Sequence, residues 1–139
     1  MSLAQTIYAN FCEKLYVAAA LTTEIEGVKE QTQQLKSTGI PLVMTTGYDR
    51  RMVDQTRKHL PWLDDVLLDC ITNSDVRAGR PAPYMIHHAM ERVLTYDPSF
   101  ILNVGDTLVD LQSADNACIP CVLVTSGSIK PDDAIAANH

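Results

Sequence analysis

Several features that would place this 139-residue chain in a specialised class are absent from its sequence. No apolar run approaches the roughly 18 residues needed to cross a bilayer, and the N-terminus lacks the pattern of a signal peptide. Basic residues are not in excess, since the net charge is −6 and the pI is near 5.0. A nucleic-acid partner calls for a concentrated basic surface. Neither a membrane nor a nucleic acid is therefore an expected partner.

Cysteine is also sparse, and its four positions form no dense disulfide framework. This pattern predicts reduced thiols in a cytoplasmic protein. Only Cys118 and Cys121 have the spacing of a redox or zinc pair. A thioredoxin-type pair gains reactivity by opening a helix, whereas this pair is expected to leave a helix and enter a strand. No second Cys pair or suitable His spacing completes a zinc site, so a redox module is the weakest of the functional hypotheses.

The sequence does contain an alternation of helical patterns and short apolar runs. Its length and its composition, 46% hydrophobic and 20% charged, are those of one ordinary globular domain. Apolar spacing predicts helices near 3–20, 24–38, 49–59, 83–94 and 107–117, and strands near 41–44, 66–71, 100–104 and 121–124. This alternation predicts an α/β fold with a parallel sheet covered on both faces. The stretch after Gly127 is expected to be loosely ordered.

The strand near 100–104 ends at Gly105, and two carboxylates, Asp106 and Asp110, follow four residues apart. Ligands of open α/β sheets bind beyond the carboxyl ends of the strands, and paired hard oxygen donors there suit Mg²⁺ holding a phosphate or phosphonate. A second interpretation needs no ligand: Thr107 as N-cap with Asp110 three residues on forms a capping box. Both interpretations stay open at this point.

Two further polar segments carry candidate chemistry. Thr46 and Gly47 end the strand near 41–44, where a hydroxyl and backbone N–H groups can bind a phosphate oxygen. Capping of the following helix is the alternative. Arg80 lies between Gly79 and Pro81 in a loop stiffened by proline, where a guanidinium can pair with a phosphoryl group and nearby acids. A solvated loop arginine is the alternative there.

The ordered set of segments resembles the haloacid dehalogenase superfamily, and within it the phosphonoacetaldehyde hydrolase-like branch. Residues 45–51 are similar to the second motif of that branch, 79–86 to its third and 104–110 to its fourth, which Asn116 continues. The likeness extends from about residue 24 to 128. The resemblance implies a three-layer, Rossmann-like core with a parallel sheet.

The same resemblance implies a role for each candidate residue. Thr46 and Gly47 would bind the transferring phosphoryl group, and Arg80 would steady the charge on nucleophile and phosphate. Asp106 would ligate Mg²⁺, and Asp110 would ligate it or orient its ligands. The resemblance also implies a small phosphorylated or phosphonate compound as the substrate. This division of roles fits phosphoryl transfer, where positioning and charge neutralisation carry most of the catalysis.

One departure from the family pattern limits these expectations. Members begin with a strand ending in Asp-x-x-Gly-Thr, whose first Asp is the nucleophile, and no such segment precedes Thr45. Residues 1–23 resemble a remnant cap helix, 24–128 a partial core missing its usual first, central strand, and 129–139 a C-terminal tail. A sheet without its central strand exposes open edges, which predicts a homodimer or higher homo-oligomer.

Two functional hypotheses follow from this combination. The first is a Mg²⁺-dependent hydrolase of phosphate or phosphonate compounds that is inactive as this chain alone. The second is a non-catalytic binding or oligomerisation module that retains the fold.

Overall fold

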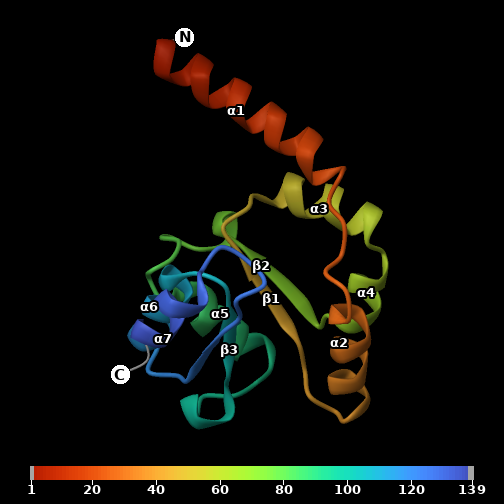
Figure 1. Cartoon of the computed structure of the whole chain (residues 1–139), viewed down its shortest axis with the longest axis vertical. Coiled ribbons are helices and arrows are strands. Elements are labelled where there is room, and N and C mark those ends of the chain that lie inside the picture. Colours follow the sequence, from red (N-terminus) through yellow and green to blue (C-terminus); the bar gives the residue numbers. More distant parts are fainter. Residues whose placement is uncertain (1, 138–139) are drawn as a thin grey trace. The chain divides into compact units, whose positions relative to one another are not determined.

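The computed structural model describes residues 2–137, and the chain divides into two compact units, Met1–Thr72 and Asn73–His139. The first unit contains α1 (Leu3–Ala19), α2 (Val28–Ser37), β1 (Val43–Thr46), α3 (Arg50–His59), α4 (Trp62–Val66) and β2 (Asp69–Thr72). The second contains η1 (Asn73–Asp75), α5 (Tyr84–Arg92), η2 (Pro98–Phe100), β3 (Asn103–Gly105), α6 (Leu108–Asn116), β4 (Cys121–Leu123) and α7 (Pro131–Ala137). Figure 1 shows these elements along the chain.

The strands of each unit pair in parallel, as the alternation of helices and strands predicts. In the first unit β1 pairs with β2, and in the second β3 pairs with β4. Among the described residues these are two separate two-stranded sheets, and no strand precedes Val43. The prediction of an α/β fold with parallel strands is therefore confirmed, and the described chain has no counterpart of the usual first strand.

The core of the first unit forms where β2 and α3 bury their apolar side chains. Ile71 and Cys70 of β2 and Val53 of α3 are almost fully buried. The apolar run expected as one strand near 66–71 is divided between two elements: Val66 belongs to α4, and the strand begins only at Asp69. Two acids in the first turn of α4, Asp64 and Asp65, favour this short helix because they face the positive end of its dipole.

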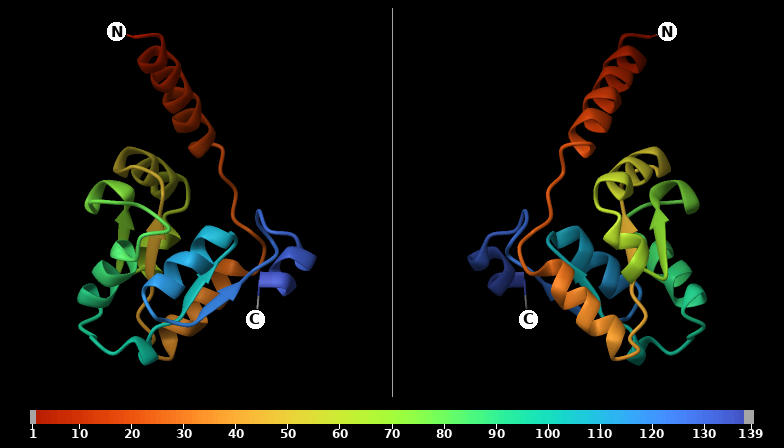
Figure 2. Two further views of the ribbon diagram at one scale, coloured as in Figure 1. Left: turned by 90° about the vertical axis from the view of Figure 1, so that its left-hand side faces the viewer. Right: turned by 90° about the vertical axis from the view of Figure 1, so that its right-hand side faces the viewer.

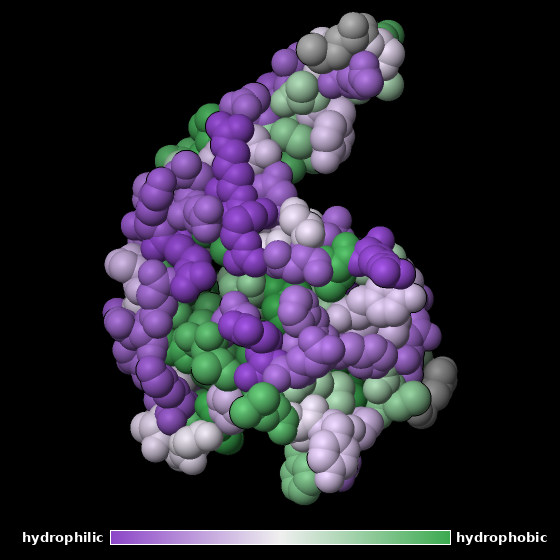
Figure 3. Space-filling model, turned by 180° about the vertical axis from the view of Figure 1, so that it is seen from behind, coloured by the Kyte–Doolittle hydropathy of each residue, from purple (hydrophilic) through white to green (hydrophobic). Residues whose placement is uncertain are grey.

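Helix α1 matches its predicted range but leaves much of its apolar face uncovered. Its C-terminal half contacts the start of α3. The Tyr16 hydroxyl donates to Asp49 Oδ2 at 2.7 Å. Arg51 Cζ lies 4.0 Å from the centroid of the Tyr16 ring, and Arg51 Nη1 lies 3.1 Å from Glu13 Oε1. In both views of Figure 2 the N-terminal half of the helix extends away from α3. Figure 3 shows hydrophobic and hydrophilic side chains interspersed along it. The most exposed apolar side chains of this half are Leu3, Ile7, Tyr8 and Phe11.

In the second unit, α5 and α6 pack together beside the β3–β4 sheet. Their cluster of buried residues consists of Ile86, Met90, Ala114, Ala117 and Ile119, with Ile101 and Cys121 packed against it. The expectation of a loosely ordered stretch after Gly127 is wrong, because Ile129 is buried and α7 follows it. Pro131 in the first turn is compatible with a helix start, and the Asp132 carboxylate interacts favourably with the positive N-terminal end of the helix dipole.

None of the helices that the structure describes is both long enough and apolar enough to span a membrane.

The burial of Ile71 yields a test of the first unit's core. Ile71 is 2% exposed, so Ile71→Ala leaves a cavity and should lower the free energy of unfolding by about 2–5 kcal/mol. Ile7→Ala removes the same atoms from a side chain that is 60% exposed, and its effect should stay within about 0.5 kcal/mol. Urea unfolding followed by circular dichroism measures both. Equal losses for the two variants would contradict the placement of β2 in the core.

Candidate functional site

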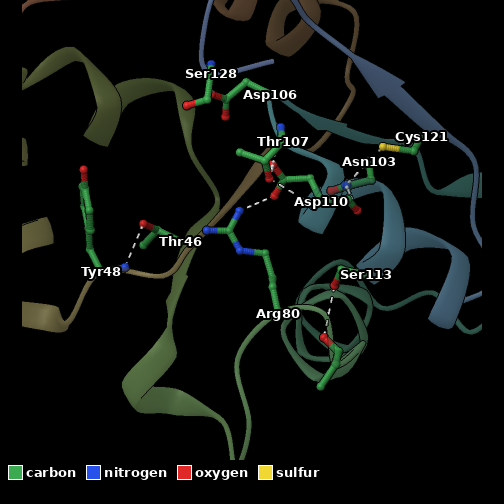
Figure 4. Close-up of polar contacts among 11 residues, drawn as sticks. Thr46, Tyr48, Arg80, Asn103, Asp106, Thr107, Asp110, Ser113, Cys121 and Ser128 are labelled. Carbon is green, nitrogen blue, oxygen red and sulfur yellow. Dashed lines mark hydrogen bonds and ion pairs between the residues drawn. The ribbon is translucent and has the colours of Figure 1, made fainter. Parts of the chain in front are cut away.

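Arg80 and Asp110, 30 residues apart in the sequence, form an ion pair in the second unit. Arg80 Nη1 donates to Asp110 Oδ1, and the two side chains are 29% and 8% exposed (Figure 4). The guanidinium comes from the proline-stiffened loop before α5, and the carboxylate comes from the first turn of α6. The alternative of a freely solvated loop arginine is therefore not what the structure shows.

The second oxygen of Asp110 is used by the start of its own helix. Asp110 Oδ2 accepts from the Thr107 backbone N–H at 3.0 Å and from the Thr107 hydroxyl at 2.6 Å. Thr107 Oγ1 in turn accepts from the Asp110 N–H at 3.2 Å, which completes a capping box. The interpretation of Asp110 as part of a helix capping box is thus correct. The same carboxylate also pairs with Arg80.

These contacts set the ionisation of Asp110. Burial by itself would raise the pKa of the Asp110 carboxyl, but hydrogen bonds from Thr107 and Arg80 and the guanidinium charge outweigh it. The pKa is therefore held below its ordinary value. Asp110 is an anion at neutral pH with a partner on each oxygen.

Asp106 lies at the carboxyl end of β3 and is held by backbone groups of the loop between β4 and α7. Its Oδ2 accepts from the Ser128 N–H at 2.8 Å, and its carbonyl accepts from the Ile129 N–H at 3.0 Å (Figure 4). Gly127 makes this approach possible, because a Cβ at that position would lie 2.1 Å from Asp106 Oδ2. Asp106 Oδ1 accepts no hydrogen bond from the part of the chain that the structure describes.

This donor set fits Mg²⁺ with one direct carboxylate ligand. Asp106 offers an orientated carboxylate with one oxygen available, whereas both oxygens of Asp110 already have partners. Residues 2–137 contain no cluster of three or more His, Cys, Asp or Glu side chains that could form a closed metal cage. Mg²⁺ tolerates such a site, since it commonly keeps several waters and binds through one or two carboxylates plus phosphate oxygens.

Thr46 and Gly47 belong to the first unit, at the end of β1. Thr46 is half-buried, and its Oγ1 accepts from the Tyr48 N–H at 3.2 Å. The hydroxyl proton of Thr46 is not used in that contact, so it can still be donated to an anion. Neither residue caps the next helix, because the N-cap of α3 is Asp49, which accepts from the Met52 N–H at 2.9 Å.

Three residues of the second unit reach this site without having been singled out as site residues from the sequence. Asn103 Nδ2 donates to the Asp110 carbonyl at 3.2 Å and lies 3.5 Å from Cys121 Sγ. Ser113 and Asn116 of α6 donate to carbonyls of the Arg80 loop. Among these three, Asn116 had a signal in the sequence, because it continues the fourth motif of the family resemblance.

The Cys118–Cys121 pair differs from a thioredoxin-type pair in its place in the fold. The pair leaves α6, which ends at Asn116, and enters β4, as the sequence predicts. Burial raises the pKa of the Cys121 thiol, with the charges of Asp110 and Asp115 acting in the same direction against the hydrogen bond from Asn103. A raised thiol pKa lowers the thiolate fraction that redox exchange requires.

Parallel strands alternating with helices, and polar side chains at the carboxyl end of β3, define an α/β protein of the open-sheet class, in which ligands bind at the carboxyl ends of the strands. Comparison with known proteins narrows this class. Residues 4–124 match the family model described as haloacid dehalogenase-like hydrolase. The chain belongs to this family.

Curated relatives and solved structures agree with the assignment. The chain is 36% identical over 128 residues to phosphonoacetaldehyde hydrolase of Bacillus cytotoxicus and 32% identical over 123 residues to that of Parabacteroides distasonis. These alignments cover 89% and 88% of this chain but 47% of each relative, so the chain spans about half of their length.

Among solved structures, a phosphonoacetaldehyde hydrolase-like protein from Oleispira antarctica shares the fold with a TM-score of 0.82 at 22% identity, over 95% of this chain and 50% of that one. A haloacid dehalogenase-superfamily hydrolase from Geobacter sulfurreducens gives a TM-score of 0.70 at 28% identity. That comparison covers 78% of this chain and 54% of the other.

The contacts of Asp110 predict how stability depends on pH. Because its pKa is lowered in the folded state, Asp110 contributes stability fully above the unfolded pKa, about 3.9. That contribution is lost as the pH falls through the folded pKa. Asp110→Asn should lower the free energy of unfolding by roughly 1–3 kcal/mol at pH 7, and the difference from wild type should shrink below about pH 4. Urea unfolding at pH 7 and pH 3 measures it.

Asp115→Asn is the matched control, because Asp115 is an exposed residue of the same helix. A difference between Asp110→Asn and wild type that stays constant from pH 7 to pH 3 would contradict an ionised, paired Asp110.

Proposed function

We propose that this chain is the Mg²⁺- and phosphate-binding part of a phosphonatase-like hydrolase. One observation carries the proposal. At the junction of β3 and α6, Asp106 presents a carboxylate oxygen that is open, while Asp110 holds the Arg80 guanidinium. A carboxylate that can bind Mg²⁺ and a guanidinium held in place are groups that stabilise the negative charge of a phosphoryl or phosphonyl group.

In this proposal Asp106 holds Mg²⁺, which when bound supplies positive charge to the oxygens of the phosphoryl group. Arg80 binds a phosphate or phosphonate oxygen with the donors that Asp110 does not use. Asp110 orients Arg80 and caps α6, so its role is that of a positioning residue. In the first unit, the Thr46 hydroxyl proton and the Gly47 N–H are proposed as donors to a phosphate oxygen, as the family resemblance implies.

The substrate class rests on the relatives. Both curated relatives described above are named phosphonoacetaldehyde hydrolase, which makes phosphonoacetaldehyde the first compound to test. The 139 residues contain no Asp-x-x-Gly-Thr segment to supply a nucleophile, so this chain alone is proposed to bind without turnover. We place the protein in the cytoplasm, where its thiols stay reduced.

A titration of Mg²⁺ in the presence of inorganic phosphate tests the proposal. The chain should bind Mg²⁺, and Asp106→Asn should weaken binding at least about tenfold, a loss already typical of substitutions beside metal ligands. Asp115→Asn should leave the affinity unchanged. Isothermal titration calorimetry measures all three proteins, and a parallel assay with phosphonoacetaldehyde should detect no product.

Two results would count against this assignment. Equal Mg²⁺ affinity in wild type and Asp106→Asn would contradict the assignment of Asp106 as a metal ligand. It would favour the hypothesis of a non-catalytic binding or oligomerisation module. Turnover that is lost in Asp106→Asn would show that another acid of this chain replaces the nucleophile.

The open strand edges support a further part of the proposal, that the chain is a homodimer or larger homo-oligomer. Each strand of a two-stranded sheet pairs on one edge only, and apolar side chains of β3 and β4 such as Val104 and Val122 are exposed. Light scattering coupled to gel filtration should give at least twice the 15.3 kDa of one chain. A mass of one chain at 0.1 mM would reject it.

A further inference from the structure

The loop that carries Arg80 has few backbone donors with which to hold itself in place. Pro81 and Pro83 have no N–H, and the Ala82 N–H is used to close a turn on the Gly79 carbonyl at 3.1 Å. Neither a helix nor a strand includes residues 79–83. The position of Arg80 therefore depends on groups outside the loop.

Helix α6 supplies those groups from one of its sides. Ser113 Oγ donates to the Ala82 carbonyl at 3.1 Å, which Figure 4 shows, and Asn116 Nδ2 donates to the Pro81 carbonyl at 2.9 Å. Asp110, one turn earlier on the same helix, accepts from the Arg80 guanidinium. Residues three apart on a helix are neighbours on its surface, so these three side chains form one row.

The row binds both the side chain of Arg80 and the backbone that follows it. Ser113 is 1% exposed, so its hydrogen bond is shielded from water. On another side of the loop, Gly79 lies against Asn73, because a Cβ on Gly79 would be 2.1 Å from Asn73 Oδ1. The loop has little room to shift, and a shift would carry the guanidinium away from Asp110.

We propose that Ser113 and Asn116 are positioning residues that fix the Arg80 loop to α6 and so aim the guanidinium at the phosphate. The second half of this statement rests on the proposed function, whereas the fixing of the loop does not. The two halves therefore have separate readouts.

The first readout is the guanidinium itself, in the full chain labelled with ¹⁵N-arginine. In wild type the paired Arg80 should give Nη protons with slow rotation and slow exchange with water, assigned by their loss in Arg80→Lys. Ser113→Ala combined with Asn116→Leu should make these signals broaden and exchange faster. Gln112→Leu, an exposed amide-to-leucine change on the same helix, should leave them as in wild type.

The second readout is phosphate affinity with Mg²⁺ present. The double substitution should weaken binding roughly fivefold, the factor that about one net hydrogen bond represents. In an Arg80→Ala background it should cause no further loss, since there is no guanidinium left to position. A merely structural role would weaken binding by the same factor in both backgrounds.

The proposal is overturned if the Arg80 signals in the double variant match wild type, or if the loss of affinity is the same without Arg80. If wild type binds no phosphate, the proposed function fails, and the guanidinium signals still decide whether the loop is held. Should Ser113→Ala prevent folding, Asn116→Leu alone, at an exposed position, is compared by the same two readouts.

Discussion

The candidate site depends on the hydrogen bonds that the Asp110 carboxylate accepts. One oxygen receives the Arg80 guanidinium, and the other receives the Thr107 N–H and hydroxyl. The first contact spans 30 residues, and the second starts α6. A single buried anion thus couples the beginning of a helix to the position of a distant cation. Neither oxygen can turn toward a metal ion without losing one of these contacts, whereas Asp106 keeps one oxygen without a hydrogen bond from the described residues.

Much of the fold could be predicted from spacing, because helices of nine residues or more repeat their apolar positions several times. The predicted helix over 49–59 matches α3, and the one over 83–94 contains α5. Helix α4, with five residues, is too short for a repeat, and its Val66 was assigned to the next strand. Helix α7 was missed because its order depends on Ile129, which is buried by tertiary packing that no local pattern records.

The residues of the site could be predicted more easily than their pairing. Polar residues after apolar runs mark strand ends, which is why Asp106 was identified from the sequence, and Arg80 was identified from the prolines that stiffen its loop. Their geometry depends on contacts that do not follow from spacing. Asp106 is fixed by the N–H of Ser128, and this contact is possible only because Gly127 has no side chain. For Asp110, the sequence presented helix capping and site chemistry as alternatives, whereas the structure assigns one task to each oxygen.

The division of tasks between the two acids has an electrostatic consequence. Asp106 and Asp110 contribute two negative charges and Arg80 one positive charge, so the three together carry a charge of −1. Such a group does not attract a phosphate dianion. Because Arg80 pairs with Asp110, the remaining negative charge lies on the Asp106 carboxylate, which has one oxygen without a hydrogen bond from the described residues. A divalent cation at that oxygen changes the sum to +1, and the guanidinium and the cation then attract the same anion. Under the proposed function, the Arg80–Asp110 pair leaves Asp106 as the acid with an oxygen open to a cation, and that cation would have to bind before Arg80 could hold a phosphate.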